Sequence, residues 1–324
     1  MKKNLFIFLL ISSIFIGGNL FAQKVVYTST DNPTGYLQVF TMNIDGTDKK
    51  QLTAINQNCM YPRWSYDGTK IIFYTDNQDI YLISDLNGVS NPYFVFKGYN
   101  PCFTWDDENI IFVAEHEGFT TLYIMQPTEP EPSPLSADDY STMQVLAADG
   151  RTMVYSAFEG GDKDIFITDL ADSTAVDGVR LTKNNDSELE PDISPDGSMV
   201  TYASFDMNLR GTIYVYKDNK EIALTQGMGS TNQPKFSPDN KLIAFVLITD
   251  NSVDLYTMNT DGTNKKKIPT VGGSVGNYRW VDASRIIYDV EIGDANQIGI
   301  VNVYNNEVKY LTSKGANAYP DVTK

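Results

Sequence analysis

One hairpin-like segment recurs along this chain of 324 residues, and it restricts the possible fold more than any other feature. The clearest copy, "EPDISPDGSMVTYAS", begins at residue 190 and joins a Pro-Asp-Gly turn to an apolar strand. The first apolar residue after the turn falls at Val25, Ile71, Ile110, Met153, Val200, Ile243 and Ile286. Successive copies are 39 to 47 residues apart, which is the period of a four-stranded propeller blade.

Each copy continues with a further apolar strand, and in most copies a short fourth strand closes the unit. The further strand carries an aromatic residue in six copies and a glycine in the last: Phe40, Tyr81, Tyr123, Phe166, Tyr214, Tyr256 and Gly299. We expect these aromatic side chains to fill the space between neighbouring sheets.

The two ends of the repeat region complement each other. The segment "AYPDVTK" at the C-terminus matches the part that precedes the turn in other copies, with Pro320 standing 43 residues after Asn277. It should supply the first strand of a blade whose other strands come from residues 24–53, which removes a free sheet edge. The sequence therefore predicts an all-β fold, a single seven-bladed β-propeller of four-stranded antiparallel blades over residues 23–324.

The turns have the chemistry of tight hairpins. Gly accepts positive φ, and Asp caps nearby backbone amides. We assign structural turns, without a catalytic role, to Asp67, Gly68, Asp149, Gly150, Asp196, Gly197 and Asp239.

Residues 1–22 have the pattern of a secretory signal peptide. Lys2 and Lys3 precede an apolar run, and Ala22 offers a small residue for cleavage. An uncleaved anchor is the alternative, but the run is short against the roughly 20 residues of a spanning helix. We expect a periplasmic or secreted protein, cleaved after Ala22, monomeric and without membrane insertion of the mature chain.

The composition excludes some partners. A formal net charge of −16 repels nucleic acid and anionic lipid, which argues against both as ligands. The two cysteines, Cys59 and Cys102, fall in neighbouring units at different heights, so we expect their thiols to remain unbridged.

The "SPDG" hairpin followed by "TIYVY" or "DLYTM" resembles the WD40-like repeat of the TolB family and of peptidase propeller domains, and the resemblance covers all seven units. It implies the propeller fold and says little about activity. TolB proteins join a six-bladed propeller to an N-terminal α/β domain, whereas the first strand here follows the signal directly. We therefore do not expect their contact with a peptidoglycan-associated lipoprotein. A peptidase activity would need a catalytic domain after the propeller.

Two features look like catalytic groups. "GGSVG" at 272–276 matches G-x-S-x-G, but Ser274 lies between blades and no histidine follows it. The only histidine, His116, stands between Glu115 and Glu117 near a strand end. One histidine without cysteine ligands is a poor transition-metal set, so we interpret it as a solvated loop residue.

Acidic segments at 159–164, 183–190 and 291–296 offer oxygen ligands for calcium, although none has the spacing of an EF-hand loop. We expect no cofactor, with calcium as the possibility to test. Paired carboxylates of this kind also suit a glycosidase, but sequence gives no separation between them.

Ligand-binding candidates lie in the first strand of two units, where "YPRW" and "YRW" place an Arg–Trp pair near the axis. The guanidinium is suited to a carboxylate and the indole to a sugar face. The candidate residues are Tyr61, Arg63, Trp64, Tyr278, Arg279 and Trp280. The alternative is that both tryptophans pack between inner strands.

The sequence favours a non-enzymatic exported scaffold that binds an envelope protein or a glycan. The alternative is a divalent-cation-dependent propeller enzyme acting on a carbohydrate or a lactone. Three or more carboxylates or amides converging on the axis would favour the enzyme, whereas apolar and scattered polar groups would favour the scaffold.

Overall fold

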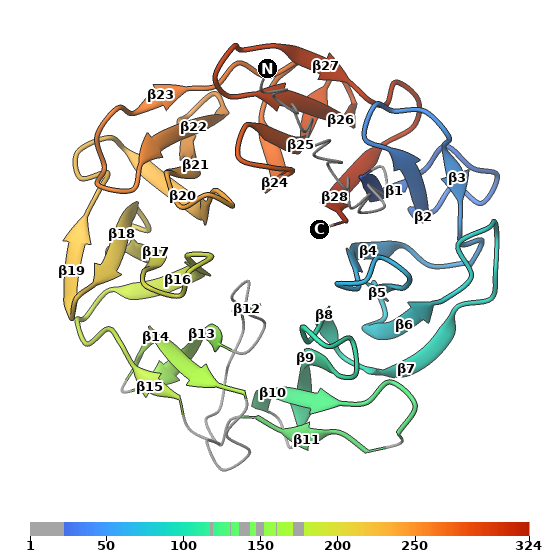
Figure 1. The fold of residues 1–324 in the computed structure, drawn as a ribbon, viewed down its shortest axis with the longest axis horizontal. Helices are drawn as coiled ribbons and strands as arrows, with labels where there is room; N and C mark the ends of the chain where they lie inside the picture. The colour runs from blue at the N-terminus through green and yellow to red at the C-terminus, as the bar shows by residue number, and fades with distance from the viewer. Residues whose placement is uncertain are drawn as a thin grey trace, which may run out of the picture.

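Seven four-stranded sheets surround a central axis in the computed structural model, and every pairing between neighbouring strands is antiparallel (Figure 1). The structure describes residues 23–116, 119–129, 131–135, 143–146, 152–159, 161–170 and 178–323. The predicted all-β, seven-bladed propeller is therefore confirmed. The predicted signal peptide, residues 1–22, lies outside the described residues.

The blades are numbered in chain order, and their strands are given from the axis outward. Blade 1 contains β28 (Asn317–Val322), β1 (Lys24–Ser29), β2 (Gln38–Asn43) and β3 (Lys50–Gln51). Blade 2 contains β4 (Cys59–Trp64), β5 (Ile71–Thr75), β6 (Asp79–Ile83) and β7 (Tyr93–Lys97). Blade 3 contains β8 (Tyr99–Phe103), β9 (Ile110–His116), β10 (Phe119–Met125) and β11 (Ser133–Pro134).

The remaining four blades follow the same order. Blade 4 contains β12 (Met143–Leu146), β13 (Thr152–Glu159), β14 (Asp162–Asp169) and β15 (Val179–Arg180). Blade 5 contains β16 (Ser187–Ile193), β17 (Val200–Phe205), β18 (Gly211–Lys217) and β19 (Lys220–Ala223). Blade 6 contains β20 (Ser230–Phe236), β21 (Leu242–Ile248), β22 (Val253–Asn259) and β23 (Lys266–Lys267). Blade 7 contains β24 (Val275–Trp280), β25 (Arg285–Ile292), β26 (Ala295–Asn302) and β27 (Val308–Tyr310).

The ring closes as the sequence predicts. β28 pairs antiparallel with β1, so that Val25 lies opposite Val322 and Ser29 lies opposite Asn317. Figure 1 shows β28, in red, beside the blue strands of blade 1. The inner edge of β1 is thereby hydrogen-bonded instead of open to other chains.

An aromatic pair crosses the two middle strands of each of the first six blades. Tyr202 and Tyr214 of blade 5 lie opposite each other in the register and stack with their ring centroids 5.7 Å apart. Blade 7 differs, because Tyr288 lies opposite Gly299 and its ring occupies the space that a Cβ would need. The glycine that interrupts the aromatic pattern therefore leaves room for its own cross-strand neighbour.

The Asp-Gly turns are stabilised by hydrogen bonds within the turn itself. The Asp196 carboxylate accepts hydrogen bonds from the Ser198 amide at 3.0 Å and from the Ser194 hydroxyl at 2.8 Å, while Gly197 has a φ of 71°. Hydrogen bonds from Ser198 and Ser194 lower the pKa of Asp196 below its usual range. Asp67 makes corresponding bonds to Thr69, and Asp239 to Lys241, whereas Asp149 and Gly150 lie outside the described residues.

Asp289 joins the last blade to the closing strand. It is fully buried in β25, where Oδ1 accepts the backbone N–H of Asn277 at 3.0 Å. Its Oδ2 accepts the Asn277 side-chain amide at 3.0 Å and the backbone N–H of Tyr319 in β28 at 2.9 Å. Gly276 is required beside it, because a Cβ there would lie 2.1 Å from Asp289 Oδ1. One carboxylate thus connects β24, β25 and β28.

We predict that Asp289→Ala lowers the free energy of unfolding by about 2–4 kcal/mol, because it leaves buried N–H groups of β24 and β28 without an acceptor. Denaturant titration followed by circular dichroism measures the change. Asp294→Ala, at an exposed position of the β25–β26 turn, is the matched control and should stay close to wild type. Equal stability of the two variants would show that Asp289 does not hold the closure.

Candidate functional site

The innermost strands are bulged, and the bulge decides which side chains reach the axis. In β4 the pairing register shifts between Met60 and Arg63, and Tyr61 has a φ of 46°. The buried positions Cys59 and Pro62 are therefore three residues apart, whereas regular alternation would place them two apart. As a result, Met60, Tyr61 and Arg63 are all half-exposed.

The same bulge recurs around the ring. A residue with positive φ precedes a proline in five inner strands, at Tyr61, Asn100, Glu190, Gln233 and Tyr319. The residue directly after the proline, two positions beyond the residue with positive φ, is Arg63, Cys102, Asp192, Lys235 or Asp321. Blade 7 has Arg279 at this second position, after Tyr278 in place of proline. We name Tyr61, Arg63, Glu190, Asp192, Lys235, Arg279, Tyr319 and Asp321 the axis cluster.

Charges of the axis cluster influence one another across the ring. Burial raises the pKa of Tyr61 in blade 2, and the negative charges of Asp289 in blade 7 and Glu190 in blade 5 add to this effect. Burial also lowers the pKa of Lys235 in blade 6, with a contribution from the positive charge of Arg63. The axis-cluster residues among them lie on innermost strands and are partly exposed, so their side chains border the axis from different blades.

The carboxylates of the cluster are engaged by the next blade. Asp192 Oδ2 accepts the backbone N–H of Phe236 at 2.7 Å, and Glu190 Oε2 accepts that of Gln233 at 2.6 Å. Burial raises the pKa of Asp192 to about 6, against the opposing charge of Lys235. Three carboxylates do reach the axis, but each also serves the backbone or an ion pair. The axis therefore fits neither the free converging carboxylates expected of the enzyme nor the apolar and scattered polar lining expected of the scaffold.

Asp321 repeats this arrangement at the closing strand. Its Oδ2 accepts the backbone N–H of Trp64 at 3.0 Å, and its Oδ1 lies 3.6 Å from Arg279 Nε. The side chains of Arg279 and Asp321 are 25% and 17% exposed, so solvent reaches this pair.

Two further tyrosines, Tyr74 and Tyr99, extend the cluster on the side of Tyr61 and Tyr319. The rings of Tyr61 and Tyr319 are 4.1 Å apart, and Tyr61 stacks on Tyr74 with centroids separated by 5.9 Å. Tyr99 lies 6.4 Å beyond Tyr74. The blade 1, blade 2 and blade 3 sector of the axis is therefore aromatic.

The predicted binding residues divide into two groups. Tyr61, Arg63 and Arg279 belong to the axis cluster and are half-exposed. Trp64 and Trp280 are only 7% and 9% exposed and pack in the cores between blades, as the alternative interpretation expects. Trp280 Nε1 donates to the Lys235 carbonyl at 3.1 Å. Tyr278 is also buried, and its hydroxyl donates to the Gln233 carbonyl.

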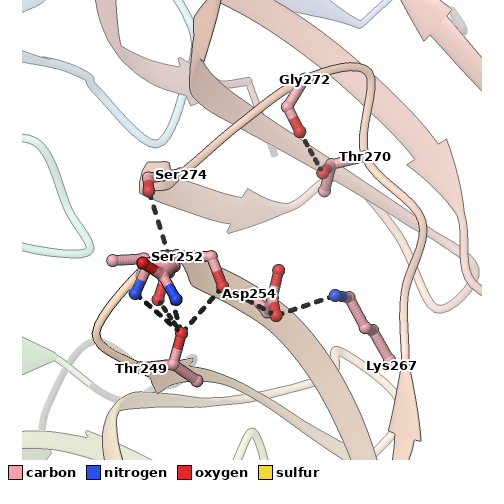
Figure 2. A network of polar contacts seen from close by, with 9 residues as sticks. Thr249, Ser252, Asp254, Lys267, Thr270, Gly272 and Ser274 are labelled. Carbon is pink, nitrogen blue, oxygen red and sulfur yellow. Dashed lines mark hydrogen bonds and ion pairs between the residues drawn. The ribbon is translucent and has the colours of Figure 1, made fainter.

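Ser274 of the G-x-S-x-G sequence has a structural contact. Its Oγ accepts the backbone N–H of Val253 at 3.2 Å, beside the β21–β22 turn. Figure 2 shows Ser274 near Ser252 of this turn. The neighbouring carboxylate, Asp254, is held by Lys267 at 2.8 Å and by the Ser252 hydroxyl at 3.2 Å. The hydroxyl therefore joins two blades, without a histidine as base.

The other sequence candidates have simpler positions. His116 is the last residue of β9, and its side chain is outside the described part of the structure. Cys59 begins β4, and burial raises the pKa of its thiol to about 12. No disulfide joins it to Cys102. In the described ranges no three His, Cys, Asp or Glu groups gather as a metal site, and no helix there is long and apolar enough to cross a membrane.

Two buried acids, which sequence reasoning missed as a pair, meet between blades 4 and 5. Asp164 and Glu188 are both fully buried, and Asp164 accepts the Thr182 hydroxyl at 3.0 Å and pairs with Arg180 at 2.5 Å. Glu188 Oε1 accepts the Ser204 hydroxyl at 2.9 Å, while Oε2 has no hydrogen-bond partner among the residues that the structure describes. Burial raises the pKa of Glu188 to about 7, and the charge of Asp164 adds to this.

The corresponding pair between blades 7 and 1 is neutral. There the Asn317 side-chain amide donates to Gln297 Oε1 at 3.1 Å. Gln297 and Asp164 occupy the same place in their blades. Each precedes a residue whose N–H donates to a threonine hydroxyl two positions after the fourth strand, Thr312 and Thr182 respectively. Alignment of the repeats places Glu188 over Asn317 and would have identified the acid pair. Asp164 and Glu188 thus occupy, between blades 4 and 5, the positions that Gln297 and Asn317 occupy between blades 7 and 1.

Known proteins of two kinds resemble this chain. The pattern of the TolB beta propeller domain family (PD40) matches residues 18–207 and 171–324. Dipeptidyl-peptidase 5 of Porphyromonas gingivalis is 22% identical over 88% of this chain and 44% of its own length. The Tol-Pal system protein TolB of Francisella tularensis subsp. mediasiatica is 23% identical over 77% of this chain and 61% of its own length.

Solved structures show the same fold. A puromycin-hydrolyzing peptidase of Mycobacterium tuberculosis has a TM-score of 0.72 at 11% identity, over 91% of this chain and 52% of that one. The chain spans less than half the length of the dipeptidyl-peptidases that it matches, 35% and 44% in the two Porphyromonas proteins.

We predict that Glu188→Gln makes the protein less sensitive to alkaline pH. The pKa of Glu188 in the folded protein, about 7, lies above the ordinary value of 4.5, so folding favours the protonated acid. That contribution is complete below about pH 4.5 and is lost as pH rises through about 7. Glutamine stays neutral, so the variant should exceed wild type by on the order of 2 kcal/mol at pH 8.

Denaturant titrations at pH 5 and pH 8 test this. Glu291→Gln, at an exposed position, should keep the wild-type difference between the two pH values. Parallel behaviour of Glu188→Gln and wild type would contradict the assignment.

Proposed function

Because the chain belongs to the TolB beta propeller domain family, we propose that it is an exported, non-enzymatic propeller that binds a protein of the cell envelope. The observation that carries the proposal is the axis cluster, in which half-exposed aromatic and charged side chains from several blades border the axis. Tyrosine and arginine are the residue types that dominate protein interfaces energetically. The relatives named as Tol-Pal system proteins favour an envelope protein over a glycan.

The face that holds the site is rigid. Tyr61 and Arg63 lie on a strand whose neighbours Pro62 and Trp64 are buried, so their backbone is fixed before a partner arrives. A preorganised aromatic surface loses little conformational entropy on binding. The proposed partner would therefore contact strand residues at the axis as well as the loops around it.

An enzymatic role is the second candidate, and the relatives named as peptidases favour it. In that case the chain would act as the propeller of a peptidase whose catalytic groups lie elsewhere. The divalent-cation enzyme also remains an alternative to test. Both would be recognised by activity or metal binding of the purified protein.

We predict that the purified chain without residues 1–22 captures a protein from an envelope extract, and that the recombinant partner rebinds it. Tyr61→Ala should weaken rebinding at least 10-fold, because it removes a ring stacked at the axis. Tyr304→Ala removes an exposed ring from the β26–β27 loop and should not weaken it.

Calorimetry with calcium and an assay with a chromogenic dipeptide substrate accompany the capture experiment. We expect neither micromolar calcium binding nor hydrolysis. Calcium binding or hydrolysis in the absence of any reconstituted protein partner would overturn the proposal in favour of an enzyme.

A further inference from the structure

Arg63 differs from the other arginine of the axis cluster. Arg279 is paired with Asp321, and burial lowers the pKa of Lys235 against the opposing charge of Asp192. The Arg63 guanidinium makes no hydrogen bond or ion pair with any residue that the structure describes, although its side chain is only half-exposed. A guanidinium withdrawn from bulk water gains most from a planar anion that accepts two parallel hydrogen bonds.

The groups around Arg63 leave it available to a ligand. Burial raises the pKa of Tyr61 and of Tyr74, and the positive charge of Arg63 opposes this in both. The rings of Tyr61, Tyr74 and Tyr319 form a continuous aromatic surface next to Arg63. The carboxylate of the neighbouring inner strand β28, Asp321, is engaged by the Trp64 backbone N–H and by Arg279.

Lys235 of blade 6 is a further cation of the axis cluster. Burial lowers its pKa, and repulsion by the positive charge of Arg63 adds to this effect, whereas Asp192 and Glu190 oppose it. The acids in that sector, Glu190 and Asp192, each accept a backbone N–H from blade 6. An anion between Arg63 and Lys235 would relieve this repulsion.

We propose that Arg63 is the anchor for a carboxylate of the protein partner, which enters along the axis with its apolar part against the tyrosine rings. The inference rests on the proposed function, since it names the group of the partner that the axis cluster recognises. A chain terminus and an acidic side chain offer the same carboxylate. An axial site suits a terminus, which can enter without a returning segment.

The test uses calorimetry with the tripeptide acetyl-Gly-Gly-Phe, as the free acid and as the C-terminal amide. The free acid should bind, and Arg63→Gln should weaken it at least 10-fold. Lys220→Gln, at an exposed position on the outer strand β19, removes the same charge away from the axis and should not weaken it. The amide should not bind measurably.

Equal binding of acid and amide, or equal loss in both variants, would overturn the carboxylate site. So would the absence of binding by the free acid. Tighter binding of acetyl-Glu-amide than of the free tripeptide acid would overturn the terminus and indicate an acidic side chain. Tighter binding of glucuronic acid would overturn the protein ligand and indicate a glycan.

The envelope capture experiment separates this inference from the proposed function. If a partner is captured and the Arg63→Gln variant binds it as well as wild type does, the carboxylate anchor is contradicted and the scaffold function is retained. Peptide binding without any envelope partner would remove the scaffold and leave the site.

Discussion

The bulge in the innermost strand is the constraint on which the rest of the structure depends. Each inner strand must pack against both neighbouring blades and still face the axis, and a regular strand offers only two alternating faces. The positive φ at Tyr61 and at the corresponding residues changes the phase of the alternation midway along the strand. In β4, Pro62 and Trp64 then enter the core, while Arg63 between them reaches solvent.

The same acids hold the ring together and shape its centre. One oxygen of Asp321 accepts a backbone amide of blade 2, and its other oxygen faces Arg279. Asp192 has the corresponding amide contact with blade 6, at the same place in its own strand. Structure and electrostatics at the axis are therefore coupled, because removing either acid would disturb the packing of blades as well as the charge of the site.

The fold could be predicted from the sequence because every blade repeats the same apolar and turn residues. The ring closure could be predicted equally well, since Pro320 continues the period of 43 residues set by the earlier copies. The candidate site could be predicted from the sequence only in part. Arg63 and Arg279 follow a recognisable pattern, but the burial of Trp64 and Trp280 depends on the bulge, which no single residue type announces.

Contacts between blades were the hardest to anticipate. Asp164 and Glu188 are 24 positions apart in the chain and belong to different blades, so their proximity follows from the ring geometry. Within the part of the chain that the structure describes, Arg63 has no ion-pair partner, and this likewise depends on the assembled ring and not on its own strand.

The pairing of β28 with β1 also sets the order in which the protein can fold. β28 follows all the other strands of the seven blades in the chain, so the sheet of blade 1 stays incomplete until this strand has been made and has joined it. During that interval the inner edge of β1 is unpaired and open to association with other chains. The axis cluster, which needs Tyr319 and Asp321 from this last strand, can exist only once the ring is complete.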